Sequence, residues 1–378
     1  MRFWPGQPYQ TSMSLGGPIG DHATGGAVVA RSDAGRHKGR AVASSGAIEP
    51  RLGPDGGNVS AEVDDRSTRT QTIVPVTILL CTFNGGRFLE EQLASIASQS
   101  YPHWHIIASD DGSTDATLAL LGSFVARHGD QRRVEIRKGP DQGPTANFLS
   151  LAADPAIDGT YFAYCDQDDV WYPDKLERAI VWLASVPAQV PALYCARTTL
   201  IDAEGRYIGR SPLFHKAPDF RNALVQSLAG ANTMVFNRAA RALLVAAGNC
   251  DVVAHDWWTY LLISGAEGSV YYDPIPSVAY RQHRANQIGS NNGLFAALWR
   301  LTMFLRGEWT RWNDRNAAAL ARCSCLLTAT NRRRLAAFSV LRRGSLIERL
   351  RAWQQLGLYR QTRAGQMMLM LATIFRRI

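Results

Sequence analysis

The densest group of chemically active side chains is an acidic motif, CDQDDVWYP, at residues 165–173. It brings Asp166, Asp168 and Asp169 within four residues of one another. Carboxylates this close repel, so the cluster is costly unless a cation lies among them. Mg²⁺ and Mn²⁺ prefer oxygen ligands, usually one or two carboxylates together with substrate phosphates. The motif therefore predicts a divalent-cation site. The alternatives are a plain acidic loop or a calcium site, although EF-hand spacing is absent.

Two further polar motifs precede it, TFNGG at 82–86 and DDGSTD at 110–115. In the first, Phe83 could stack on a flat base and Asn84 could hydrogen-bond to it. In the second, the carboxylate of Asp111 can accept the imide N–H of a pyrimidine. The alternative for the first motif is a simple strand-to-helix turn. The alternative for the second is a helix N-cap cluster, which leaves Asp111 without a role.

The elements that must position these motifs follow from hydrophobic spacing. Apolar runs predict strands at 74–82, 105–109, 134–137, 160–165 and 193–199, and helical spacing predicts helices at 87–99, 147–153 and 175–186. A further helix is expected to be capped by Ser113, with Asp115 in its first turn, and to carry the apolar residues at 118, 121, 124 and 125. Alternating strands and helices predict an α/β fold, a mixed and mainly parallel sheet with helices on both faces. Ligands of such sheets bind outside the carboxyl ends of the strands, where all three motifs fall.

In this order and at these strand ends, the motifs resemble the nucleotide-sugar half of a family 2 glycosyltransferase of the GT-A (Rossmann-like) fold. The resemblance runs from about residue 75 to 289. It implies an enzyme that transfers a sugar from a nucleotide diphosphate donor to an acceptor hydroxyl. It also implies Mg²⁺ or Mn²⁺ as the cofactor, bound beside the donor diphosphate.

The resemblance assigns roles residue by residue. Nucleotide binding falls to Thr82, Phe83, Asn84, Asp111, Asn147 and Asp168. Metal binding falls to Asp166, Asp168, Asp169 and His283. The arginine that the family usually carries before Asn147 is missing here. For His283, the alternative is a polar loop residue without a ligand.

The acceptor side is expected from two segments, GANTMVFN at 230–237 and HDWW at 255–258. Asp256 matches the acidic residue that serves as general base in the family, taking the proton from the acceptor hydroxyl. Asn232 is expected to border the acceptor, together with one of Trp257 and Trp258. The alternatives are a helix N-cap for Asp256 and core positions for both tryptophans.

The segments DQDDVW, HDWW and YRQHxxNxIG (280–289) together are similar to those of bacterial rhamnosyltransferases. This similarity implies dTDP-L-rhamnose as the donor and a surface polysaccharide or lipid-linked glycan as the acceptor. Arg281 or Arg284 could neutralise phosphate charge. Neither a QxxRW motif nor a multi-helix membrane channel is found, which favours addition of a single sugar.

Three regions are expected along the 378 residues. Residues 1–72, rich in Gly and Ser, predict a disordered or dispensable extension. Residues 73–293 form the GT-A domain, and residues 294–378 form a basic helical region. The last region holds sixteen arginines, no lysine and three acidic residues, hence +13, in a chain of +9 overall. Such an imbalance favours an anionic partner at this end of the chain.

The basic C-terminal arm predicts amphipathic helices, typical of proteins that lie on an anionic membrane surface. The alternative is a helical subdomain packed on the catalytic domain, and the two are compatible. Signal-peptide and membrane-spanning patterns are absent, which predicts a cytoplasmic protein, peripheral on the inner face of the cell membrane. The six cysteines show no metal-ligand spacing and are expected to be reduced thiols.

Two rival functions remain. The first is a nucleotide-sugar-binding protein that has lost catalysis, against which the acidic cluster and Asp256 argue together. The second is a nucleic-acid binder acting through the arginine-rich arm. The arm lacks a recognised nucleic-acid-binding motif, so no nucleic-acid partner is expected.

Overall fold

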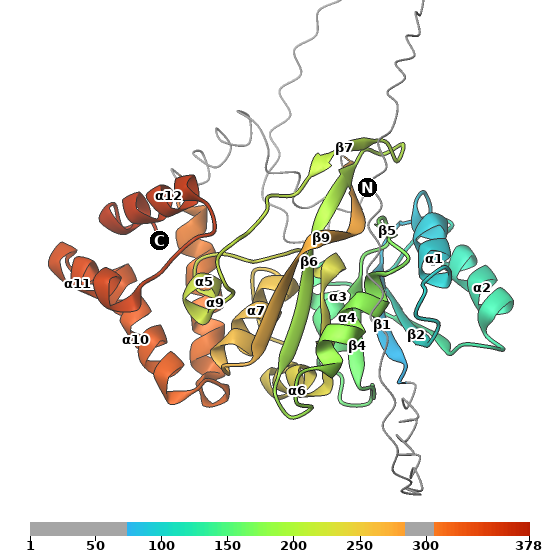
Figure 1. The fold of residues 1–378 in the computed structure, drawn as a ribbon, viewed down its shortest axis with the longest axis horizontal. Coiled ribbons are helices and arrows are strands. Elements are labelled where there is room, and N and C mark those ends of the chain that lie inside the picture. Colours follow the sequence, from blue (N-terminus) through green and yellow to red (C-terminus); the bar gives the residue numbers. More distant parts are fainter. Residues whose placement is uncertain (1–73, 284–305) are drawn as a thin grey trace, which may run out of the picture. The chain divides into compact units, whose positions relative to one another are not determined.

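The computed structural model describes residues 74–283 and 306–378 (Figure 1). The N-terminal extension predicted for residues 1–72 lies outside these ranges. So does the first amphipathic stretch of the basic arm, up to residue 305, together with Arg284.

One mixed sheet runs through the first of these ranges, in the strand order β3-β2-β1-β4-β8-β6-β9-β5, with β7 paired to β6. The strands are β1 (Val76–Thr82), β2 (Trp104–Asp110), β3 (Val134–Lys138), β4 (Tyr161–Cys165), β5 (Val170–Trp171), β6 (Ala192–Ile201), β7 (Tyr207–Arg210), β8 (Val235–Asn237) and β9 (Ser269–Arg281). β3, β2, β1 and β4 are mutually parallel, whereas β8 is antiparallel to both of its neighbours. β6 and β9 are also parallel to each other. The predicted mixed sheet, mainly parallel, is confirmed.

Helices cover both faces because side chains alternate along the buried strands. In β1, Ile78 and Leu80 belong to one core cluster, while Leu79 and Cys81 belong to the other. The first face is packed by α1 (Leu89–Ala97), α2 (Thr117–His128) and α4 (Lys175–Ala184). The second is packed by α3 (Pro144–Ala152), α5 (Phe220–Ala223), α6 (Arg238–Ala247) and α7 (His255–Gly265).

The predicted elements recur with small shifts at their ends. The predicted cap at Ser113 is wrong, because α2 begins at Thr117 and has no side-chain cap. A shift of similar size is found in α3, which begins at Pro144 rather than at residue 147. Proline favours the first turn of a helix because its φ is preset and its missing N–H would have no helical partner there.

The C-terminal region is helical and packs on the second face of the sheet. It consists of α9 (Glu308–Arg322), α10 (Ala329–Arg343), α11 (Leu346–Leu356) and α12 (Arg363–Ile374), drawn in orange to red in Figure 1. Phe338 and Leu341 join the core cluster that contains α7. The side-chain amide of Asn331 donates to the carbonyls of Ser264, at 3.3 Å, and Gly265, at 2.9 Å. Of the two alternatives for the C-terminal arm, the structure therefore shows a helical subdomain packed on the catalytic domain.

Among residues 74–283 and 306–378, no helix combines the length and the apolar character needed to cross a bilayer. The six cysteines are all free thiols. Cys81, Cys165, Cys195 and Cys323 are buried, and Cys325 is exposed.

Candidate active site

The loops that follow β1 and β2 are tied together where the two parallel strands end side by side. The hydroxyl of Thr82 donates to Asp110 Oδ1 at 2.8 Å. The Asn84 N–H donates to Ser113 Oγ at 2.8 Å, and Asn84 Oδ1 accepts from the Thr114 N–H at 2.9 Å. Asn84 has a φ of 47°, in the left-handed region that asparagine tolerates better than most residues. These contacts hold the predicted base-binding turn in one shape.

Asp111 is fully buried, and its carboxylate holds the loop between β3 and α3. One oxygen accepts from the Asp141 N–H at 2.6 Å and the other from the Gly143 N–H at 2.9 Å. A Cβ at Gly139 would lie 2.6 Å from Asp111 Oδ1, so the loop approaches closely only because residue 139 is glycine. Asp111, which the sequence predicts to bind the nucleotide, therefore also fixes the loop that forms one wall of the predicted nucleotide site.

Asn147 is likewise buried and bonded to β2. Its Oδ1 accepts from the Ser109 hydroxyl at 2.5 Å, and its Nδ2 donates to the Ser109 carbonyl at 3.0 Å. Both bonds fix α3 against the strand end, beneath the loop that Asp111 anchors.

The acidic motif forms the loop between β4 and β5, and its carboxylates divide into two kinds. Asp169 is fully buried; its Oδ2 accepts from Asn232 Nδ2 at 2.6 Å and its Oδ1 from the Arg281 N–H at 3.0 Å. Asp166 and Asp168 are partly exposed. The predicted acceptor residue Asn232 thus lies against Asp169, 3% exposed, in the turn at Ala231–Thr233.

Gln167 joins the acidic loop to the turn after β1. Its Oε1 accepts from the Phe83 N–H at 2.8 Å, and its Nε2 donates to the Phe83 carbonyl at 3.0 Å. A Cβ at Gly85 would lie 2.2 Å from Gln167 Oε1, so the first glycine of TFNGG leaves room for this side chain. The role of Gln167 was not predicted from the sequence. The only hint is that an amide side chain stands between Asp166 and Asp168 in the acidic motif.

His283 reaches the acidic loop from the end of β9. Its Nε2 lies 2.8 Å from Asp168 Oδ2, and its ring lies 5.0 Å from that of Phe88. The structure therefore brings together two of the predicted metal ligands from distant parts of the chain. Arg281, two residues earlier, is only 2% exposed; its Nε donates to the Asp168 carbonyl at 2.9 Å, and its guanidinium contacts Glu91. The Arg281 side chain thus points into the protein and stabilises the acidic loop. It does not extend toward a phosphate, as the sequence had suggested.

Asp256 stands in the first turn of α7, where its Oδ1 accepts from the Trp257 N–H at 2.6 Å. Burial raises the pKa of Asp256 to about 6, although hydrogen bonds from the backbone N–H groups of Trp257 and of Asp256 itself oppose this rise. Burial, then the charges of Asp168 and Asp256, raise the pKa of Asp166 to about 7. The proposed base and the acidic loop are therefore near enough to interact electrostatically.

The two tryptophans beside Asp256 both belong to the core. Trp258 is fully buried, whereas Trp257 is 9% exposed and its indole N–H donates to the Ala223 carbonyl at 2.6 Å. Of the two, only Trp257 has surface left for an acceptor. His255 stacks on Phe148 with ring centroids 4.0 Å apart, and its burial lowers its pKa to about 3.

The residues present fit a divalent cation held jointly with a diphosphate. The structure offers the partly exposed carboxylates of Asp166 and Asp168 with the His283 imidazole beside them, and their mutual repulsion would be relieved by a cation. Within the two described ranges, no group of three or more acidic, histidine or cysteine residues is arranged to hold a metal alone. A magnesium-like site completed by substrate phosphates needs only one or two protein carboxylates.

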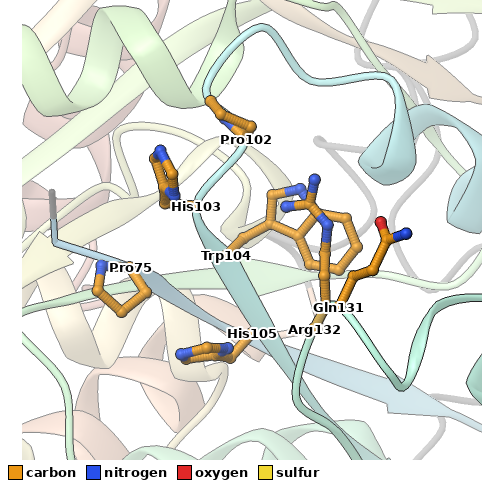
Figure 2. A pocket seen from close by; sticks show the side chains of 7 residues that line it. All are labelled: Pro75, Pro102, His103, Trp104, His105, Gln131 and Arg132. Carbon is orange, nitrogen blue, oxygen red and sulfur yellow. The ribbon is translucent and has the colours of Figure 1, made fainter.

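A pocket of about 350 Å³ lies elsewhere, at the amino ends of the strands (Figure 2). Pro75, His103 and Arg132, among its lining residues, shortly precede β1, β2 and β3. Since the acidic loop and the base-binding turn follow the carboxyl ends of β4 and β1, this pocket is separate from the candidate site.

Comparison with known proteins gives concordant results. The family model described as glycosyl transferase family 2 matches residues 77–241. A dTDP-rhamnosyl transferase, RfbG of Shigella flexneri, is 30% identical over 241 residues, covering 61% of this chain and 81% of its own.

Two solved structures also resemble the chain. Residues 1–349 of TarS from S. aureus share 14% identity, with a TM-score of 0.41, over 75% of this chain and 78% of that one. The mannosyltransferase PcManGT from Pyrobaculum calidifontis, in complex with GDP-Man and Mn²⁺, shares 19% identity, with a TM-score of 0.41, over 80% and 86%.

Both the sequence matches and the strand-end motifs lead to the same family. The curated relative is aligned over most of its own length, and the family model spans β1 to the start of α6. The chain belongs to glycosyl transferase family 2 and is a glycosyltransferase with the mixed α/β architecture of the GT-A fold.

Proposed function

We propose that the chain transfers L-rhamnose from dTDP-L-rhamnose to a hydroxyl of a polysaccharide or lipid-linked acceptor, with inversion at the anomeric carbon, in the synthesis of a surface glycan. The observation that carries the transfer chemistry is the contact of His283 with Asp168 beside Asp166 at the end of β4, and the charge of Asp256 acts on the same Asp166 carboxylate. The choice of donor is supported by the likeness to the Shigella dTDP-rhamnosyl transferase.

One set of residues would bind the donor nucleotide and its cation, and another would bind the acceptor. Phe83 and Asn84 would contact the base, in a site whose walls Asp111 and Asn147 hold. Asp166, Asp168 and His283 would hold Mg²⁺ or Mn²⁺. Asp169, also predicted as a metal ligand, is buried with both carboxylate oxygens bonded to protein donors and would instead fix the loop that carries the others. When bound, such a cation neutralises charge on the leaving diphosphate.

Asp256 would act as the general base. It accepts the proton of the acceptor hydroxyl while that oxygen forms a bond to the anomeric carbon. The bond from the anomeric carbon to the diphosphate oxygen breaks in the same step, and the nucleoside diphosphate leaves. A pKa of about 6 keeps Asp256 ionised at neutral pH yet makes it a stronger base than an ordinary aspartate. Trp257 is the tryptophan proposed to border the acceptor.

A donor panel tests this proposal. The protein, with Mn²⁺ or Mg²⁺, would be titrated by calorimetry with dTDP-rhamnose, UDP-glucose, UDP-galactose, UDP-N-acetylglucosamine and GDP-mannose. Selective, metal-dependent binding of dTDP-rhamnose is expected. Preference for another donor would overturn the rhamnose assignment. Binding of none by folded protein would favour a catalytically inactive relative.

We also propose that α11 and α12 hold the enzyme on an anionic membrane, beside a lipid-linked acceptor. The large apolar side chains of α12 and the residue after it are exposed along one stripe: Met367, Met370, Leu371, Ile374 and Phe375. α11 adds Leu346, Ile347 and Leu350, each 45% exposed or more. Exposed arginines flank both helices, at 343, 351, 363, 376 and 377. Apolar side chains rimmed by arginine are typical of helices that lie in the interface of anionic bilayers.

Vesicle co-sedimentation tests this placement. Binding to vesicles of phosphatidylglycerol, weaker binding to phosphatidylcholine, and loss on substituting Met370→Glu and Phe375→Glu together are expected. Val181, an exposed apolar residue on α4, provides the control Val181→Glu. Dimerisation through the stripe, or a shift with random DNA but none with vesicles, would contradict the membrane proposal.

A further inference from the structure

Gln167 belongs to the acidic loop, yet its side chain bonds to a different loop. Its amide oxygen accepts from the Phe83 N–H at 2.8 Å, and its amide nitrogen donates to the Phe83 carbonyl at 3.0 Å. Backbone pairing between β1 and β4 ends at Leu80 and Cys165. The Gln167 amide therefore takes the place of a backbone partner for Phe83 and joins the two strand-end loops after the ladder between them has stopped.

The turn after β1 leaves a space that this amide fills. A Cβ at Gly85 would lie 2.2 Å from Gln167 Oε1 and 2.5 Å from Gln167 Cδ. Gly85 does not have the left-handed φ that would itself require glycine, so the requirement at this position is for space. The Gly85 N–H donates to Thr117 Oγ1 at 2.8 Å, which holds the turn at this distance from the amide.

The acidic loop is thus anchored at two points. Gln167 ties it to the turn after β1, and Asp169 ties it to the other side through Asn232. The partly exposed carboxylate of Asp168 stands between these two anchors in the sequence. Since each residue has only two soft backbone dihedrals, fixing positions 167 and 169 restricts the backbone that carries Asp168. Protein contacts therefore set how far the acidic loop lies from the turn that carries Phe83.

We propose that Gln167 is a positioning residue that sets the spacing between the base subsite at Phe83 and the cation and diphosphate subsite at Asp168. A nucleoside diphosphate carries both groups at a limited separation, so a protein that holds its subsites at that separation gains binding from both ends at once. Gln167 acts through the Phe83 backbone. The inference rests on the base and cation sites of the proposed function and adds what couples them.

Calorimetric titration in Mn²⁺ with dTDP, thymidine and inorganic pyrophosphate tests this role, because only dTDP spans both subsites. Gln167→Met keeps the length of the side chain and removes both hydrogen bonds. Its dTDP binding should weaken by about tenfold, the order expected of two net hydrogen bonds. Thymidine and pyrophosphate, each filling one subsite, should bind within about twofold of the wild type.

Two results would overturn the proposal. Thymidine binding weakened as much as dTDP binding would mean that Gln167 only shapes the base turn. Pyrophosphate binding weakened as much would mean that it only supports the cation loop. As a control, Gln131→Met removes an exposed glutamine near the amino end of β3 and should match the wild type with all three ligands.

Gly85→Ala reaches the same link from its other side. The added methyl group would displace the Gln167 amide from Phe83, so dTDP binding should fall by a similar factor. Because the link can be broken only once, the double variant Gly85→Ala/Gln167→Met should bind dTDP no more weakly than the weaker single variant. Losses that add in the double variant would contradict a link through Gln167.

Failure of the proposed function would look different. If the wild type binds pyrophosphate with Mn²⁺ but not dTDP, the donor assignment fails, and UDP and GDP replace dTDP in the same comparison. If it binds none of these ligands, the cation site fails, and thermal unfolding of the same variants decides the link. Each single variant should then lower the midpoint by about 2–4 °C, and the double variant should unfold no lower than the less stable single variant. Additive losses would overturn the inference.

Discussion

The loop after β2 and the loop after β4 look alike in sequence, since each places neighbouring aspartates at the end of a strand. In the first, protein donors reach both carboxylates: Asp110 accepts from Thr82 and Ser113, and Asp111 accepts from two backbone N–H groups of the following loop. In the second, only Asp169 is held in this way. Within the two described segments, no hydrogen bond to the Asp166 carboxylate is found. The Asp168 carboxylate is hydrogen-bonded to the His283 ring.

The difference separates carboxylates that build the fold from those left for a ligand. A carboxylate that accepts backbone N–H bonds is stabilised as an anion and cannot be lost without leaving those donors unpaired. The charge of Asp166, by contrast, is repelled by both Asp168 and Asp256, so the fold gains nothing from it. Such electrostatic cost is tolerated where function requires it, which supports the proposal that the cation binds at the β4 loop.

Replacing Asp256 by Asn should have the largest effect on activity. Removal of a general base reduces turnover by about 10²–10⁴-fold, whereas donor binding, which does not involve this residue, should stay within about twofold of the wild type. Transfer of labelled rhamnose to a membrane extract, alongside calorimetric donor binding, measures both quantities. Turnover that survives in Asp256→Asn would show that another group takes the proton.

Paired substitutions in the two loops should affect stability in opposite ways. Asp111→Asn leaves one of two buried N–H groups without its acceptor and should cost about 1–3 kcal/mol of unfolding free energy. Asp166→Asn removes a repelled charge and should leave the metal-free stability unchanged or higher. Urea denaturation in EDTA compares the two variants. Equal destabilisation by both would contradict the division into fold-building and ligand-binding carboxylates.

The raised pKa of Asp256 also predicts how stability depends on pH. Since the folded carboxyl titrates at about 6 and the unfolded one near 3.8, the folded state binds more protons between these values. Stability should therefore fall as pH rises through that window. Asp256→Asn, which does not titrate, should become more stable than the wild type by about 3 kcal/mol well above pH 6, and the difference should vanish near pH 3. A constant difference across this range would mean that burial of Asp256 does not raise its pKa.

The smallest effect is expected at the tryptophans. Trp258→Phe removes a fully buried indole whose N–H has no partner among the described residues, so it should cost stability only modestly and leave the acceptor KM unchanged. Trp257→Phe should raise the acceptor KM. Steady-state kinetics over a range of acceptor concentrations separates them, and a raised KM for Trp258→Phe would place this indole at the acceptor after all.

Strand and helix positions could be predicted from hydrophobic spacing because their packing depends on near neighbours. The motifs do fall at the carboxyl ends of β1, β2 and β4, the edge of a parallel sheet at which ligands gather. The separate roles of Asp166 and Asp169 could not be predicted. The partners that bury Asp169 are Asn232 and Arg281, 63 and 112 residues away, and only tertiary packing brings them near. Arg281, which with Arg284 was a candidate for a phosphate contact, is instead buried against the Asp168 carbonyl and Glu91, contacts that the sequence does not reveal.

The central claim is that the outward carboxylates of the β4 loop bind the donor diphosphate through a divalent cation, while Asp256 serves only the acceptor. Its most direct test is calorimetric titration of dTDP-rhamnose, in the presence of Mn²⁺, into the wild type, Asp168→Asn and Asp256→Asn. The account predicts binding to the wild type and to Asp256→Asn, and loss of the metal-dependent part of binding in Asp168→Asn. Unchanged binding in Asp168→Asn, or loss of binding in Asp256→Asn, would contradict it.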